Sequence, residues 1–208
     1  MPDNVKVCSV YMELAPHGSL LDMIAKAGGI LPENVAGYCI LQVLEGLRDL
    51  HRDGYVHCDL KPENVLIFPS YTHGELCELK LAGFSLAKEP NGPNPVECLF
   101  QGEPDYLAPE AVGPCGMISS AVDIFSLGVM VSEMLGAIVT EGGKMIYFTG
   151  GLSLLAKDFV RRRIVPNPVA RATAEELMNH PFVRQSLGVL KFPVPSCLSN
   201  EVVQGRFF

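Results

Sequence analysis

The chain has 208 residues, of which 48% are hydrophobic and 19% are charged, so it can bury a core and is not a disordered protein. Its formal net charge of −7 argues against nucleic acid or an anionic membrane surface as the main partner. The seven cysteines are scattered, odd in number and without a C-x-x-C pair, which favours a reduced intracellular protein without disulfides or a zinc site.

The N-terminal part of the chain alternates apolar runs with breaks. The residues after Met1 have neither a basic start nor an apolar run, so we expect no signal peptide and a cytosolic location, with the nucleus as the alternative. Residues 6–15 are apolar and β-rich and predict a strand, and residues 19–27 take up helical spacing after the break at PHGS. A long helix is predicted from Glu33 to Gly54, because one face collects Ile40, Val43, Leu44, Leu47 and Leu50.

Two short strands and a buried helix are predicted in the middle of the chain. VLIF (65–68) and LKLA (79–82) are typical of strands that pair across a polar turn, and residues 89–105 predict a long loop. The apolar run that follows is long enough to cross a membrane, but Asp123 and Glu133 lie inside it. Charges at such positions favour a buried core helix over 119–137 instead.

The last part of the chain is predicted to be helical. After a glycine-rich gap, an amphipathic helix is predicted over 152–164, and we interpret its Arg161, Arg162 and Arg163 as a solvated face rather than a basic patch or nuclear signal. A last helix is predicted over 172–180, with Thr173 as its N-cap, and the tail beyond it shows no periodicity.

The stretch YVHCDLKPENVLI places Asp59, Lys61 and Asn64 in a polar loop between a predicted helix and a predicted strand. Asp59 would orient a substrate hydroxyl and accept its proton, and Lys61 would neutralise the charge that grows on a moving phosphoryl group. Asn64 would hold a Mg²⁺ ion without adding negative charge. The spacing H-x-D-x-K-x-x-N therefore predicts a phosphoryl-transfer site.

At these residues the chain resembles the eukaryotic protein kinase family. YVHCDLKPENVLI is similar to the catalytic loop of its serine/threonine kinases, DYLAPE (105–110) to the end of its activation segment, and DIFSLG (123–128) to its Asp-x-Trp-Ser-Leu-Gly helix. NPVARATAEELMNHPF (167–182) is similar to the closing motif of the family, which contains an arginine. The Cys58 variant, GEPDYLAPE and TAEELMNHPFV resemble most the MAP kinase kinase kinases of the plant type.

The resemblance implies a mainly α fold, which is the large C-terminal lobe of a kinase with a short β-hairpin carrying the catalytic loop. We expect this domain over residues 1–183 and a tail over 184–208. ATP and Mg²⁺ are the implied cofactors, and the implied partner is a protein substrate or a member of a kinase cascade. The implied cofactor-binding residues are Met12, Glu13 and Leu14 in the hinge, together with Leu66.

Five further residues receive structural roles from the resemblance. Asp123 would anchor the backbone of the catalytic loop, and Glu110 and Arg171 would form a buried ion pair at the end of the activation segment. His57 and Phe84 are implied to support the site.

The chain also departs from the family pattern. Gly83 stands where the family has an aspartate that binds Mg²⁺, and Glu103 adds a like charge near Asp59. Cys58 replaces an arginine, and we expect a packed side chain there rather than a reactive thiol. No glycine-rich loop and no Val-Ala-Ile-Lys strand occurs in the sequence, so we expect the small lobe to be missing.

Two hypotheses remain open. In the first, the chain is a truncated or mispredicted product of a serine/threonine kinase of the MAP kinase kinase kinase type. In the second, it is a non-catalytic pseudokinase that acts as a binding module and competes for kinase partners. Gly83 and Glu103 favour the second, whereas Asp59, Lys61 and Asn64 keep the first open.

Overall fold

A computed structural model of the chain describes residue 9 and residues 11–70, 76–93, 105–112, 116–139, 146–148, 151–163 and 165–186. The helices are α1 (Leu20–Lys26), α2 (Glu33–Arg52), α3 (Ser120–Met134), α4 (Leu154–Arg161), α5 (Ala174–Met178) and α6 (Pro181–Ser186). The strands are β1 (Val65–Phe68), β2 (Glu78–Leu81), β3 (Ala137–Val139) and β4 (Ile146–Phe148). The predicted fold class, mainly α with a short β-hairpin, is confirmed.

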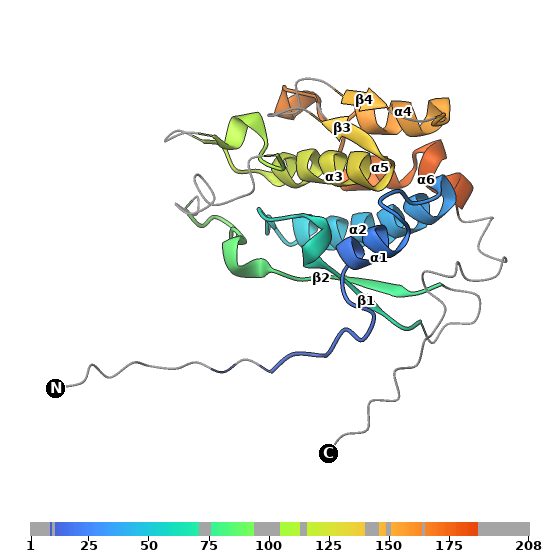
Figure 1. Cartoon of the computed structure of the whole chain (residues 1–208). Coiled ribbons are helices and arrows are strands. Elements are labelled where there is room, and N and C mark those ends of the chain that lie inside the picture. Colours follow the sequence, from blue (N-terminus) through green and yellow to red (C-terminus); the bar gives the residue numbers. More distant parts are fainter. Residues whose placement is uncertain are drawn as a thin grey trace, which may run out of the picture.

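The elements are arranged in layers around α2 and α3 (Figure 1). The β1–β2 hairpin packs on one side of α2, and α3 packs on the other side. β3 and α4 then cover α3, while α5 and α6 pack against α2. This arrangement places the loop between α2 and β1 close to the start of α3, where the polar residues of the predicted site gather.

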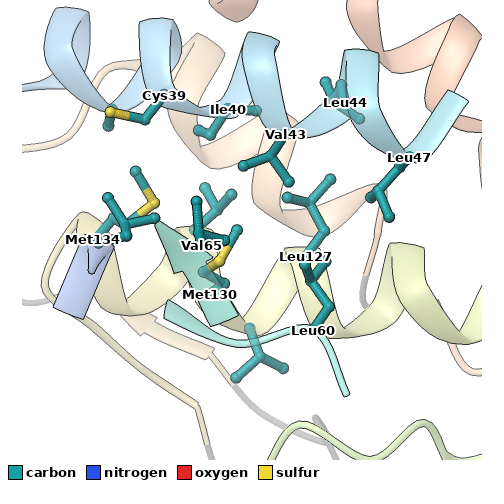
Figure 2. Packing of buried hydrophobic residues seen from close by; sticks show 14 of the residues in the cluster. Cys39, Ile40, Val43, Leu44, Leu47, Leu60, Val65, Leu127, Met130 and Met134 are labelled. Carbon is teal, nitrogen blue, oxygen red and sulfur yellow. The ribbon is translucent and has the colours of Figure 1, made fainter. Parts of the chain in front are cut away.

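The core lies between α2 and α3 (Figure 2). Side chains of α2 face residues of β1, of α3 and of the loop before β1, and the labelled members are Cys39, Ile40, Val43, Leu44, Leu47, Leu60, Val65, Leu127, Met130 and Met134. The stripe predicted for α2 is therefore largely the face that is buried. α3 is buried on nearly all sides, as predicted for a core helix. Among the described residues, no helix is both long enough and apolar enough to cross a membrane.

The β1–β2 hairpin is antiparallel and runs from the pair Val65–Leu81 to the pair Phe68–Glu78, which confirms the two predicted strands. Side chains of α2 fix the hairpin in place. The Gln42 side chain accepts a hydrogen bond from the Leu79 backbone N–H at 2.9 Å. The Tyr38 hydroxyl also donates to the Cys77 carbonyl at 2.7 Å. The hairpin therefore has a fixed position relative to the helix that precedes the loop of Asp59, Lys61 and Asn64.

Three predictions on secondary structure need correction, and one hairpin was not predicted. No strand forms over 11–15, because these residues pair with no strand in the described part of the chain. The helix predicted over 119–137 ends at Met134, since Gly136 takes a φ of +69° in the left-handed region and β3 follows. The β3–β4 hairpin was not predicted, because strands of three residues carry almost no periodic signal. The helix predicted over 152–164 is shorter and ends at Arg161.

The number of helices at the end of the lobe differs from the prediction. Thr173 is the N-cap of α5, as predicted, and its hydroxyl accepts a hydrogen bond from the Glu176 backbone N–H at 3.2 Å. This helix is not the last one, because Pro181 begins α6, which continues to Ser186. Glu103 and the tail from residue 187 onward lie outside the described residues.

The interpretation of the three arginines as a solvated face is wrong for one of them. Arg161 and Arg162 are exposed, but Arg163 follows the end of α4 and is completely buried. Its guanidinium stacks on the ring of Phe159. In the described part of the chain, its three guanidinium nitrogens have no hydrogen-bond partner.

Candidate active site

The backbone of the catalytic loop is held by Asp123, a completely buried carboxylate at the start of α3. Its two oxygens accept the backbone N–H groups of His57 at 2.8 Å and of Cys58 at 2.9 Å. His51, from the last turn of α2, places its Nε2 at 2.7 Å from the same carboxylate. A buried carboxylate is costly unless it is hydrogen-bonded, and these three donors satisfy it. Cys58, half-buried, is held there with a φ of +64°.

Asp59, Lys61 and Asn64 come together in the loop that Asp123 holds. The Asn64 Nδ2 donates to the Asp59 carbonyl at 2.7 Å and to the Asp59 Oδ2 at 2.8 Å. The Lys61 Nζ lies 3.5 Å from the Asp59 Oδ1. A short 3₁₀ turn, Pro62–Asn64, brings the asparagine back toward the aspartate. The structure thus places a carboxylate beside an ammonium and a carboxamide, as the sequence spacing predicted.

Gly83 lies directly against Asn64. The Ala82 backbone N–H, one residue before it, donates to the Asn64 carbonyl at 2.8 Å. His57 is completely buried and connects the same segment to the loop, because its Nδ1 accepts the Asp59 N–H and its Nε2 lies 2.8 Å from the Ala82 carbonyl. These two contacts place the proton on Nε2. The His57 ring also contacts Phe84, which is 47% exposed.

The residues present fit the Mg²⁺ ion that the sequence pattern implied only in part. Mg²⁺ is commonly held by one or two carboxylates together with water and substrate phosphates. Asn64 directs its amide nitrogen at Asp59, which leaves its amide oxygen as the ligand atom it could offer, and Gly83 has no side-chain oxygen. Among the described residues, no three His, Cys, Asp or Glu side chains are grouped closely enough to hold a metal ion.

The expected cofactor-binding residues are brought together only in part. The Glu13 carboxylate pairs with the Lys80 Nζ at 2.7 Å and raises the pKa of that lysine. Lys80 stands opposite Leu66 in the β1–β2 register, so the hinge lies beside the hairpin. Met12 and Leu14 are 71% and 84% exposed.

The segment that ends at Glu110 is tied to the rest of the lobe by an ion pair. The Arg171 guanidinium makes two hydrogen bonds to the Glu110 carboxylate, at 2.5 and 3.1 Å. It also donates to the carbonyls of Ala121 and Val165, and its side chain is fully buried. The pair therefore joins the segment to α3 and to the turn before α5.

Sequence reasoning missed His51 and the contact between Tyr106 and Glu133. The place of His51 next to the buried stripe of α2 could have marked it as a partner for a buried acid. The Tyr106 hydroxyl donates to the Glu133 carboxylate, and Ser126 donates to the Tyr106 carbonyl at 2.8 Å. A carboxylate inside an apolar helix was the available signal for the second contact.

The comparisons with known proteins agree with one another. The family model for the protein kinase domain matches residues 2–148. Mitogen-activated protein kinase kinase kinase 3 of Arabidopsis thaliana is 32% identical over 213 residues, which cover 96% of this chain and 34% of the relative. Mitogen-activated protein kinase kinase kinase 18 of the same plant is 35% identical over 195 residues, which cover 84% of this chain and 54% of the relative.

A solved structure is also similar to the chain. The crystal structure of the Rad53 kinase domain and SCD2 in complex with AMPPNP superposes with a TM-score of 0.66 at 28% identity. The match covers 83% of this chain and 68% of that one. The chain spans about a third to a half of the length of the two plant relatives named above.

Proposed function

The chain belongs to the protein kinase family, and we propose that it acts in protein phosphorylation as a member of the mitogen-activated protein kinase kinase kinase type. ATP would be the phosphoryl donor, and a serine or threonine hydroxyl of a cascade protein would be the acceptor. The observation that carries this proposal is the loop held by Asp123, in which Asp59 and Lys61 lie 3.5 Å apart. The kinase names of the relatives support it.

The roles proposed for the two residues follow from their charges. The Asp59 carboxylate, 17% exposed, would accept a hydrogen bond from the substrate hydroxyl and then its proton as the new bond to phosphorus forms. The Lys61 ammonium, 21% exposed, would lie next to the negative charge of the transferred group. Both side chains are buried enough for their orientation to be fixed and exposed enough to reach a substrate.

A second function, that of a non-catalytic pseudokinase, is favoured by the contact between Gly83 and Asn64. Without the carboxylate that the family has at position 83, the protein lacks one ligand of the Mg²⁺ ion that offsets the negative charge of the nucleotide phosphates. Losing such a ligand costs several kcal/mol in the transition state, and each ~1.4 kcal/mol slows the reaction about tenfold. Such a chain would bind cascade proteins and compete for them without phosphorylating them.

Phosphate transfer and partner binding can be measured on the same protein. The 208-residue chain is incubated with radiolabelled ATP and a mitogen-activated protein kinase kinase, beside the Asp59→Asn variant, and binding of the same acceptor is measured by calorimetry. Incorporation that disappears in the variant supports the enzyme. Binding without incorporation supports the pseudokinase. If the chain shows neither incorporation of phosphate nor binding of the acceptor, both forms of the proposed function are contradicted.

A further inference from the structure

We propose that a groove between α2 and β2 (the α2–β2 groove) binds a basic, amphipathic helix of a partner protein. The groove has a volume of about 570 Å³ and lies between two elements that are neighbours in the fold (Figure 1). Its lining includes none of Asp59, Lys61 and Asn64. The inference therefore goes beyond the proposed function and holds whether or not the chain transfers phosphate.

The floor of the α2–β2 groove is apolar and held in place. Leu50 of α2 and Leu79 and Leu81 of β2 are among the residues that line it. The helix and the strand approach each other closely, because a Cβ atom built on Gly46 would lie 3.0 Å from the Leu81 Cδ1. The Leu79 N–H also donates to the Gln42 side chain at 2.9 Å. The groove is thus part of the folded lobe, and an occupant needs apolar side chains to cover its floor.

Carboxylates dominate the charge of the groove. The lining contains the four acidic residues Glu45, Asp49, Asp53 and Glu78. Among the described residues that line it, the one base is Lys80, and its ammonium already pairs with the Glu13 carboxylate at 2.7 Å. Asp49 also pairs with Arg48 and Arg52, which lie outside the lining. Counting these ion-pair partners, five carboxylates face three cations, so a negative charge remains for a cationic occupant to offset.

Three of the carboxylates form a row along α2. Glu45 and Asp49 lie in the helix and Asp53 is its C-cap, so the three recur on one side about every 6 Å. Like charges at this spacing, and acids at the C-terminal end of a helix, destabilise the helix that carries them. A helix with lysine or arginine at every fourth position repeats its cations at the same distance, and its apolar side chains can cover the floor. The charge, the spacing and the floor together point to this kind of partner.

Fluorescence anisotropy of a labelled synthetic peptide tests the assignment on the full chain. The probe is a helical peptide with lysine at every fourth position and leucine beside each lysine, and two control peptides carry glutamate for lysine or serine for leucine. The lysine–leucine peptide is expected to bind at least about tenfold more tightly than either control. Equal binding of the lysine–serine peptide would mean general attraction to a chain of net charge −7 and would overturn the proposal. Absence of binding by the lysine–leucine peptide would overturn it as well.

Two double variants with the same change of charge locate the binding site. Glu45→Lys with Asp53→Lys reverses two charges in the groove, whereas Glu89→Lys with Glu175→Lys reverses two exposed charges outside it. The first pair is expected to weaken binding of the lysine–leucine peptide by about tenfold or more, and the second by less than about threefold. Equal losses would overturn the proposal.

The two measurements stand apart from the test of the proposed function. The comparison of peptides needs no variant, so it decides the matter if a variant fails to fold. Neither measurement uses ATP or the kinase acceptor. A chain without phosphate transfer and without acceptor binding would therefore contradict the proposed function and leave this inference standing.

Discussion

Replacing Arg163 with methionine is expected to stabilise the protein. The side chain is completely buried against Phe159, and among the described residues none hydrogen-bonds its guanidinium. Burial holds the pKa of this arginine well below its usual range, since the folded protein disfavours the charged form. Methionine has a similar length without a charge, so it can fill the same volume.

The magnitude follows from two opposing contributions. An uncompensated buried charge costs about 3–5 kcal/mol, whereas the contact between the guanidinium and the Phe159 ring returns about 1–2 kcal/mol. The net gain in the free energy of unfolding is about 1–4 kcal/mol, which corresponds to roughly 2–16 °C in Tm for a chain of this size.

The assay is thermal unfolding followed by circular dichroism, with Arg162→Met as the matched control. Among the described residues, the one ion pair of Arg162 is with Asp158 at the surface, so its replacement should change the free energy of unfolding by about 0.5 kcal/mol or less. Arg163→Gln, which removes the charge but keeps the polarity, should fall between methionine and arginine. A lower Tm for Arg163→Met, with the control unchanged, would mean that the guanidinium has an anionic partner, and the reasoning would be refuted.

Three more predictions concern contacts that hold the lobe together. Arg171→Lys loses the paired hydrogen bonds to Glu110 and should lower the free energy of unfolding, measured by chemical denaturation, by about 2–4 kcal/mol. An unchanged denaturant concentration at the midpoint of unfolding would contradict this. Burial lowers the pKa of His180 from its ordinary 6.5, against the opposing contact with Asp158, so the unfolded chain binds the proton more tightly. Stability should therefore be complete above pH 6.5 and decline below it, and His180→Gln should flatten that decline in a series of unfolding curves. Thr173→Ala removes the cap of α5 and should cost about 0.5–2 kcal/mol, whereas Thr173→Ser, measured beside it, should retain most of the stability.

The sequence predicted best what depends on local pattern. α2 was predicted from the 3.6-residue spacing of Val43 and Leu47 and their neighbours, and the burial of that face follows the same periodicity. The β1–β2 hairpin was predicted from two short apolar runs around a polar turn. The polar loop between them was recognised because Asp59, Lys61 and Asn64 are close in sequence as well as in space.

What the sequence did not reveal depends on packing between distant segments. Three consecutive arginines are usually a solvated face, and only the contact of Arg163 with Phe159 of α4 shows that one of them is buried. Gly83 could be recognised as lacking a ligand, but the sequence gives no sign that the Asn64 side chain lies in its place. That relation exists only once β2 has paired with β1.

The contact of Asp123 with the His57 and Cys58 amides also determines what the site requires in order to form during folding. The carboxylate and the amides are separated by 66 and 65 residues of chain, so the loop cannot acquire its shape until α3 has docked. These two amides are shielded by a buried acid, and they should exchange hydrogen with solvent only when the lobe opens as a whole. The loop that carries Asp59 thus depends on the docking of α3, and its hydrogen exchange should report on the stability of the entire lobe.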